Sequence, residues 1–276
     1  LIEETFLKAD DTFCVEEATP AEATAAVETL IPKSIKRGCK WAFRKKQGYE
    51  IPRAYILPKS KRKFSTARSI IPFRQHVMHK VHRACGRVLT CIMEDVYKTN
   101  SFNMNTTQQA LDRVRKFSRH LSKRGPQLRD RQPVISTSND DIVGFFLAQS
   151  QSKIKACVGR LLSRYQATRK SSDRAWWTVN LGKTQDGASS CHRGRVPGAQ
   201  GFFFPEDIIP DVVAHALDTP VFQIGSTVVR QIQGACIGSP LSPVLNILAV
   251  AEAEWSFLAS LGLRRLEWNH NWMSAR

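Results

Sequence analysis

The chain has 276 residues, 42% of them hydrophobic, which is long enough to bury the core of one or two domains. Lysine and arginine number 41 against 24 aspartate and glutamate, and the formal net charge of +17 indicates a polyanionic partner, usually nucleic acid. No run approaches the roughly 18 apolar residues of a membrane-spanning helix, and no secretory signal opens the sequence.

The seven cysteines are odd in number and include no C-x-x-C pair. This pattern favours free thiols in a reducing, intracellular compartment and argues against a zinc site. An anionic membrane surface is the alternative polyanion, but the absence of a spanning segment leads us to expect no membrane partner.

The charge of the chain changes abruptly from negative to positive after residue 32. Residues 1–32 are acidic and alanine-rich, and we expect one amphipathic helix at 20–30 in an otherwise irregular segment. Residues 33–50 are basic and contain Trp41 and Phe43. A basic helix lying on phosphates is one interpretation, with the two rings either stacking on bases or packing into the core.

A basic hairpin is predicted next. Residues 54–57 and 67–71 are β-prone, and the turn between them is rich in lysine. Lysine supplies point charge and arginine supplies bidentate donors, so such a hairpin suits a triphosphate or a nucleic-acid backbone. A solvated hairpin that binds nothing is the alternative.

The middle of the chain alternates predicted helices and strands. A strand is expected at 133–138, and two short strands at 221–232 flank Gly225 and Ser226. Residues 171–200 indicate a hairpin or an insertion. Apolar spacing, with Glu206 and Asp207 in the first turn of the last helix, predicts helices at 75–97, 108–121, 154–165 and 205–217.

The most specific stretch is Gln231–Pro243, QIQGACIGSPLSP. Glycine and proline are unfavourable inside regular elements, so this stretch predicts a loop whose backbone approaches a ligand closely. A helix is expected at 244–258, with Ser239 or Ser242 as N-cap and a proline in its first turn. An ordinary tight loop before a core helix is the alternative.

This stretch resembles the GSPLSP signature, motif B, of reverse transcriptases, and its Q-x-x-G-x-x-x-GSPLSP form is similar to those of non-LTR and Penelope-like retroelements. Upstream, Asp141 followed five residues later by Phe146 resembles motif A. Residues 51–73 resemble the fingers hairpin. Each stretch has an ordinary alternative, a helix cap for Asp141 and a core ring for Phe146, but the three occur in the order of the family.

The resemblance implies an α+β right-hand polymerase fold. An acidic segment at 1–32 would precede fingers at 33–136 and an incomplete palm at 137–276. The implied activity is RNA-directed DNA synthesis, in which a DNA or RNA primer 3′-hydroxyl attacks the α-phosphate of a dNTP on an RNA template.

The same resemblance assigns roles to residues. Asp141, with the backbone carbonyl of Ile142, would bind Mg²⁺ (or Mn²⁺), and Phe146 would exclude the ribose 2′-hydroxyl. Lys59 and Arg68 would hold the triphosphate. The remaining assignments are template–primer contacts, which fall on Gly238, Ser239, Pro240, Arg62, Lys63 and Arg74.

Two features depart from the family pattern. No aspartate follows Asp218, so the aromatic-x-Asp-Asp motif that supplies the second metal-binding carboxylate is missing, and we expect this chain alone to be an inactive fragment. Ile237 stands where many reverse transcriptases have glutamine. The alternatives are an inactive retroelement remnant and an RNA-binding or maturase-like protein. In a eukaryotic retroelement the location would be nuclear.

Overall fold

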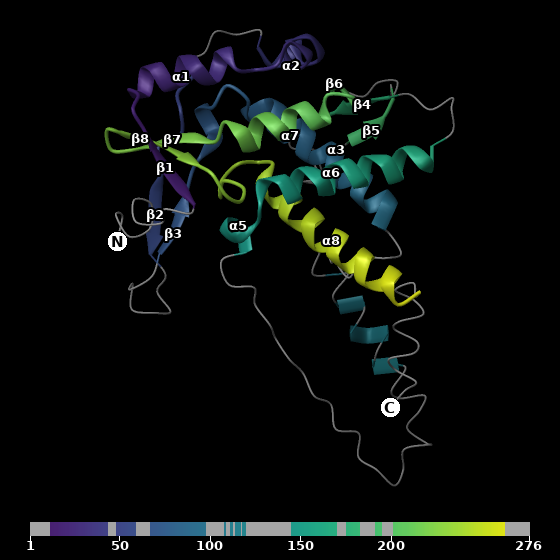
Figure 1. The fold of residues 1–276 in the computed structure, drawn as a ribbon. Helices are drawn as coiled ribbons and strands as arrows, with labels where there is room; N and C mark the ends of the chain where they lie inside the picture. The colour runs from purple at the N-terminus through teal and green to yellow at the C-terminus, as the bar shows by residue number, and fades with distance from the viewer. Residues whose placement is uncertain are drawn as a thin grey trace.

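The computed structural model describes residues 12–43, 48–58, 67–97, 108, 111–112, 114–116, 118–119, 145–169, 175–182, 191–194 and 201–262. A layer of helices forms its centre, with small antiparallel sheets at its margins (Figure 1). The central helices are α3 (His79–Tyr97), α6 (Gln151–Ala167), α7 (Ile209–Asp218) and α8 (Ser242–Ser260).

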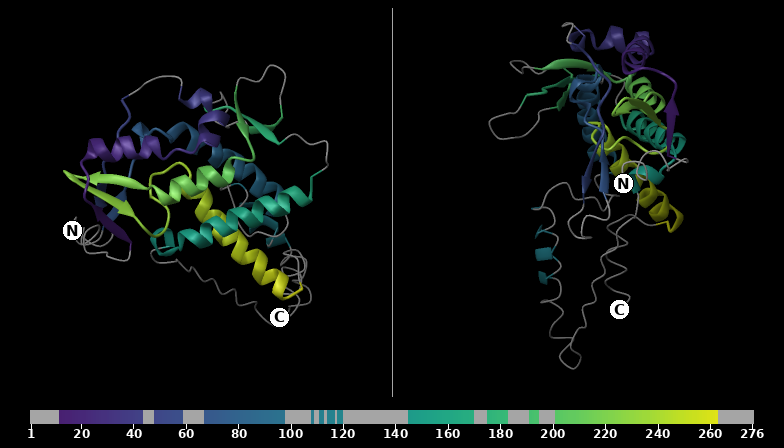
Figure 2. Two further views of the ribbon diagram at one scale, coloured as in Figure 1. Left: turned by 45° about the horizontal axis from the view of Figure 1, so that its top comes forward. Right: turned by 90° about the vertical axis from the view of Figure 1, so that its left-hand side faces the viewer.

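These helices enclose the main hydrophobic core. Apolar residues recur at helical spacing along each of them, so each buries one side against its neighbours. Two further views show α8 crossing α6, against which it packs (Figure 2). The buried positions include Val81, Val88, Leu89, Ile92, Ile154, Leu161, Val212, Leu245 and Leu248. The predicted helices at 154–165 and 244–258 are therefore confirmed.

A three-stranded sheet orders β1 (Phe13–Glu16), β8 (Thr227–Gln231) and β7 (Val221–Ile224), with β8 in the middle. The two strands predicted at 221–232 are confirmed. Strand β1 corrects our expectation of an irregular segment. Its hydrogen-bonding partners come from β8, and Phe13 packs edge-on against Phe222 at 5.9 Å between ring centroids.

The predicted helix at 20–30 is confirmed as α1 (Pro20–Thr29). It begins with a capping box, in which the Thr19 side chain accepts from the Glu22 backbone N–H and the Glu22 carboxylate accepts from the Thr19 backbone N–H. The basic segment that follows forms short helical turns, α2 (Lys33–Gly38) and η2 (Lys40–Ala42), instead of one basic helix.

The predicted basic hairpin is confirmed as β2 (Tyr55–Pro58) paired antiparallel with β3 (Ala67–Ile70). Its base is tied to β7, because the Ala54 N–H donates to the Gln223 carbonyl and the Gln223 N–H donates to the Pro52 carbonyl, both at 2.8 Å. A second apolar cluster joins β1, β7, β8, the residues that follow β3 and the loop between β8 and α8 through Phe13, Ile71, Phe73, Phe222, Val229 and Cys236.

A further sheet orders β5 (Cys191–Arg193), β4 (Trp176–Val179) and β6 (Phe202–Pro205). The pairing of β4 with β5 confirms a hairpin within 171–200. The helix predicted at 205–217 begins later, at Ile209. Pro205 ends β6, and the buried Glu206 carboxylate accepts from Arg169 at 2.6 Å and from the Trp177 ring N–H at 3.2 Å, which holds the chain outside the helix.

The helix predicted at 75–97 also begins later. Residues Phe73–Gln75 form the turn η4, and His76 is extended, with its Nδ1 accepting from the Met78 N–H at 3.2 Å. The described residues between 108 and 119 are helical, as predicted. The strand predicted at 133–138 lies outside the described residues.

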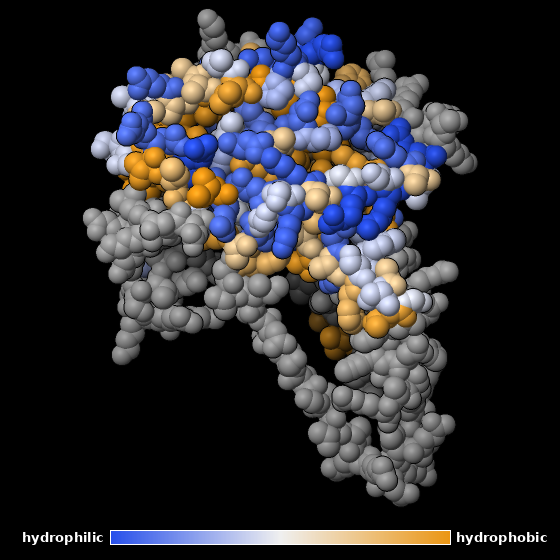
Figure 3. Space-filling view, in the orientation of Figure 1, coloured by the Kyte–Doolittle hydropathy of each residue, from blue (hydrophilic) through white to orange (hydrophobic). Residues whose placement is uncertain are grey.

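The surface is strongly divided in character. Hydrophilic residues cover much of the face over α6 and α7, and hydrophobic residues gather over the β1–β8–β7 sheet (Figure 3). Within the described ranges, no helix has both the length and the apolar character that crossing a bilayer requires.

Candidate nucleic-acid interface at the Gly238 loop

The loop that connects β8 to α8, residues 232–241, contains the most specific sequence motif and is here called the Gly238 loop. Two of its glycines have positive φ, 68° at Gly234 and 113° at Gly238. Side chains rarely adopt such backbone angles, so glycine is needed at both turns. The two glycines in the sequence therefore determine where the backbone of the loop turns.

The Gly238 loop lies directly on the end of the β2–β3 hairpin. The Ile71 N–H donates to the Ile237 carbonyl at 2.7 Å. A Cβ added at Gly238 would lie 2.5 Å from the Ile71 carbonyl oxygen and 2.9 Å from its carbon. Since the obstacle is backbone, no rotamer change relieves it, and only glycine permits this approach.

The loop also contacts residues 149–151, at the beginning of α6. The Gly234 N–H donates to the Gln149 carbonyl at 2.7 Å, and the Gln149 side chain donates to Asn246 Oδ1 at 2.8 Å. Gln151 reaches back to the Gln231 carbonyl at 3.2 Å. Helix α5 (Phe145–Ala148), immediately before Gln149, is thereby held beside the loop.

Ser239 and Pro240 complete the turn into α8. Ser239 is buried, and its Oγ accepts from the Leu241 N–H at 3.3 Å. The helix begins at Ser242 with Leu241 as its N-cap, so the predicted serine N-cap is wrong. The Ser239 carbonyl accepts the Ser242 N–H at 3.2 Å and so tightens the turn before the helix, while Pro243 occupies the first turn as predicted.

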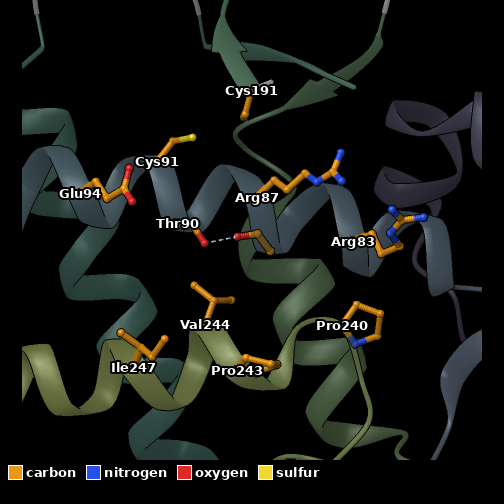
Figure 4. Close-up of a pocket in the computed structure, with 11 residues that line it drawn as sticks. Arg83, Arg87, Thr90, Cys91, Glu94, Cys191, Pro240, Pro243, Val244 and Ile247 are labelled. Carbon is orange, nitrogen blue, oxygen red and sulfur yellow. Dashed lines mark hydrogen bonds between the residues drawn. The ribbon is translucent and has the colours of Figure 1, made fainter. Parts of the chain in front are cut away.

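A pocket of about 500 Å³ opens between this turn and α3 (Figure 4). Its α3 wall carries Arg83, Arg87 and Thr90, and Pro240 lies on the facing wall. Helix α3 and the loop approach each other closely at Gly86, where an added Cβ would lie 3.2 Å from the Pro240 carbonyl oxygen. Arg83, Arg87 and Pro240 thus line one pocket, and Figure 4 shows the Arg87 guanidinium pointing away from Pro240.

The two arginines differ in how they are held. Arg83 donates to the Leu181 carbonyl at 2.9 Å. Arg87 Nη1 is buried and has no hydrogen-bond partner in the structure. Burial, with the neighbouring Arg83 as a second cause, lowers the pKa of Arg87. A buried donor of this kind is unfavourable until an acceptor binds, and a phosphate oxygen would satisfy it.

Two thiols line the end of the same pocket. Cys91 on α3 and Cys191 on β5 point toward one another (Figure 4). Their mutual hydrogen bond lowers the pKa of Cys91, and that bond together with burial raises the pKa of Cys191. All seven cysteines are free thiols in the structure.

The predicted site residues fall into groups. Gly238, Ser239 and Pro240 lie in the loop just described. Arg68 lies on β3 opposite Leu57, and Phe146 lies within α5. Arg74, an exposed residue in η4, lines a different pocket of about 260 Å³ together with His79 and Lys80, so it is not brought to the Pro240 pocket. Lys59, Arg62, Lys63, Asp141 and Ile142 lie outside the described residues.

Sequence reasoning missed Arg83 and Arg87. Their spacing of one helical turn within the predicted helix at 75–97 was a usable signal, because it places both on one side. For metal ligands, the described ranges hold no group of three or more histidine, cysteine, aspartate or glutamate side chains able to bind an ion. The predicted ligand Asp141 is not among those residues.

Comparison with known proteins places the fold. No protein-family model matches the sequence, and no curated protein matches it. Among solved structures, the chain is similar to a telomerase from Candida albicans, solved in complex with a fragment of telomeric RNA, with a TM-score of 0.55 at 9% identity. The match covers 91% of this chain but 37% of the telomerase chain. The chain therefore has a mixed α+β fold that resembles part of a telomerase, which is a reverse transcriptase.

Proposed function

We propose that this chain forms the fingers and part of the palm of an RNA-directed DNA polymerase and binds an RNA template paired with a primer. One observation carries the proposal. The Gly238 loop contacts both the end of the basic hairpin and the segment after motif A, through Ile71 and Gln149. Stretches far apart in sequence, each of which resembles a motif of the same family, therefore meet around one loop.

The pocket beside the loop supports a nucleic-acid ligand. Arg83 and Arg87 would contact backbone phosphates of the template strand, because guanidinium groups bind phosphate bidentately and Arg87 has an unsatisfied buried donor. The net charge of +17 adds a general, sequence-independent attraction.

The chemistry would depend on residues outside the described ranges. In this proposal Asp141 and the Ile142 carbonyl bind Mg²⁺ or Mn²⁺, hard ions for which oxygen donors are suitable ligands. The bound ions would stabilise the charge that develops on the transferred phosphoryl group. Lys59 and Arg68 would bind the dNTP triphosphate, and Phe146 would contact its sugar.

A second function is favoured by the basic side chains of the described surface. Arg83 and Arg87 line a pocket, and their charge suits phosphate without any metal ion. An RNA-binding protein without polymerase activity would need only the basic surfaces. Template–primer binding is common to both functions, whereas primer extension belongs to the first.

Binding of a labelled RNA–DNA hybrid, titrated at about 50 and 200 mM salt, tests the shared step. We expect the affinity to fall steeply with salt, and Arg87→Gln to reduce the slope of log K against log salt by about 0.9, the value for one phosphate contact. Arg230→Gln is the matched control, since Arg230 lies on β8 and pairs with Glu16 on β1, in a sheet that does not line the pocket. Absence of hybrid binding at low salt contradicts the proposal.

A further inference from the structure

An aromatic cluster surrounds the edge strand β6, on elements other than those that hold the Gly238 loop. The Trp41 ring stacks on the Phe202 ring, with 4.4 Å between centroids and an interplanar angle of 15°. On the neighbouring residue, the Phe203 ring meets Trp176 edge-on at 4.8 Å and 75°. Trp41 Nε1 donates to the Phe203 carbonyl at 2.9 Å, which fixes the indole against the strand.

These rings are open to solvent on one side. Phe202 is 41% exposed and Phe203 is 50% exposed. Strand register places Phe203 opposite Thr178, and Thr178 opposite the exposed His192, so the three share the outer face of the β5–β4–β6 sheet. The inner face is buried through Trp177 and Phe204. Phe202, opposite the buried Val179, alternates to the other face of the strand, so the Phe203–Trp176 pair and the Trp41–Phe202 stack lie on either side of the edge strand β6.

A row of cations lies beside the rings. Lys33, Lys36, Arg37 and Lys40 are exposed and recur at the spacing of one helix side, opposite the fully buried Ile35 and Cys39. Within the part of the chain that the structure describes, none of the four cations is in an ion pair. Asp211, on α7 beside α2, accepts from the Ser34 hydroxyl. The surface therefore keeps a positive excess.

The row and the rings form one surface. Helix α2 packs against the end of β6, where a Cβ added at Gly38 would lie 3.1 Å from Pro205 Cγ. Lys40 immediately precedes Trp41 in η2. The cations consequently lead along α2 to the ring pair at the edge of the sheet.

We propose that this surface, formed by α2, η2 and the rings on either side of the edge strand β6, binds single-stranded nucleic acid. Bases would stack on Phe203 and on the Trp41–Phe202 pair, and phosphates would lie along the row of cations. Stacking on aromatic rings beside a positively charged track is how proteins bind single strands without reading their sequence. RNA and DNA share this chemistry, and the surface would act whether or not the chain polymerises.

Fluorescence anisotropy with a labelled oligouridylate of about 12 nucleotides, its deoxythymidylate equivalent and a blunt RNA–DNA hybrid tests the proposal. We expect Phe203→Ala to weaken single-strand binding about 5- to 100-fold and to leave hybrid binding unchanged. Lys40→Gln should reduce the salt slope for single strands by about 0.7. Phe257→Ala, at a 51% exposed ring on α8, is the matched control and should change neither.

Unchanged single-strand binding in both Phe203→Ala and Lys40→Gln, with circular dichroism spectra like that of the parent, would overturn the proposal. So would a loss of self-association or of binding to anionic vesicles in place of a loss of oligonucleotide binding, because the surface would then serve a second copy or a membrane. The proposed polymerase function is tested separately, by the affinity of the parent for the RNA–DNA hybrid and by the salt slope of Arg87→Gln.

Discussion

The Ile71 N–H and the Ile237 carbonyl, 2.7 Å apart, join the end of the basic hairpin to the Gly238 loop. The bond lies beside the second apolar cluster, in which Ile71 packs with Cys236. Hairpin and loop are therefore positioned by the same buried contacts. A ligand that displaces the hairpin would therefore also displace the loop, and the reverse holds.

Gly238→Ala should damage this junction more than a glycine substitution elsewhere. At Gly238 a side chain would adopt an unfavourable φ of 113° and also collide with the Ile71 backbone. We expect a loss of at least about 3 kcal/mol in the free energy of unfolding, from backbone strain and overpacking together. Gly225→Ala is the matched control, because its φ of 60° is also positive but nothing lies within 4 Å.

The control should lose about 1–2 kcal/mol, the cost of the left-handed backbone alone. Urea unfolding of the two variants and the parent measures both values. Equal losses would mean that the loop moves away from Ile71 without penalty, and the close approach would then have no role in positioning the hairpin.

Much of the helical framework followed from the sequence because apolar periodicity is a local signal. Helices α1, α6 and α8 and the β7–β8 pair lie where spacing and turn residues predict them. Helix starts were less predictable. The start of α3 depends on His76 accepting from Met78, and the start of α7 depends on Glu206 binding Arg169, which is remote in sequence.

The remaining features depend on partners that a linear pattern does not reveal. Strand β1 exists because β8 pairs with it, and nothing in Phe13–Glu16 itself specifies that partner. The pocket at Arg87 depends on α3 lying within van der Waals distance of Pro240, which requires Gly86. The motif suggested the Gly238 loop, but only the tertiary fold brings arginines to it.

Buried histidines should make the protein sensitive to mild acid. Burial, followed by His215 and His79, lowers the pKa of His76 to about 3, and burial, followed by His76, lowers the pKa of His82 well below its usual range. Between pH 6.5 and these values the unfolded chain binds protons that the folded chain does not. Stability is therefore complete above about pH 6.5 and is lost as pH falls.

From pH 7.5 to 5.5 we expect each of the two histidines to remove about 1.4 kcal/mol from the free energy of unfolding. His82→Leu should flatten the acid limb by that amount, because neither ring nitrogen of His82 has a hydrogen-bond partner among the described residues. Urea midpoints across the pH range measure it. The exposed His192→Gln controls for loss of a histidine as such, and an unchanged acid limb in His82→Leu would refute the account.

A buried carboxylate ties three helices together. Glu252 on α8 is 2% exposed and accepts from Arg160 Nε at 2.7 Å, from Arg164 and from the Tyr97 hydroxyl. Glu252→Ala should lower the free energy of unfolding by about 3–5 kcal/mol, because it leaves a partly buried Arg164 unpaired. Asp218→Ala, which breaks an exposed ion pair with Lys155, should cost less than about 1 kcal/mol.

Thermal or urea unfolding of the two variants separates these cases. Tyr97→Phe removes one hydroxyl donor and should fall between them, at about 2 kcal/mol. A Glu252→Ala loss no larger than that of Asp218→Ala would show that the α3–α6–α8 packing does not depend on this carboxylate.

Asp141 is predicted to be essential for chemistry and dispensable for binding. The 276-residue chain should show little primer extension on its own, so the test uses a version that also carries a palm segment with an aromatic-x-Asp-Asp motif. There Asp141→Asn should abolish extension, because an amide lacks the charge that a hard cation requires, and hybrid affinity should stay close to that of the parent. Robust extension by Asp141→Asn would remove Asp141 from the metal site.

Phe146→Ala should act on sugar selection in the same extended version. Phe146 lies within α5, whose following residue Gln149 bonds to Gly234 and to Asn246, so its backbone is held beside the Gly238 loop. If the ring contacts the sugar of the incoming nucleotide, removing it makes room for a 2′-hydroxyl. The preference for dNTP over NTP should then fall at least about 10-fold, measured as the ratio of kcat/KM values for the two nucleotides.

Phe145→Ala, one residue earlier on the same helix, is the matched control and should keep the preference. If both variants keep it, Phe146 is a packing residue. The assignment of Asp141 would then weaken too, because both rest on the same five-residue spacing.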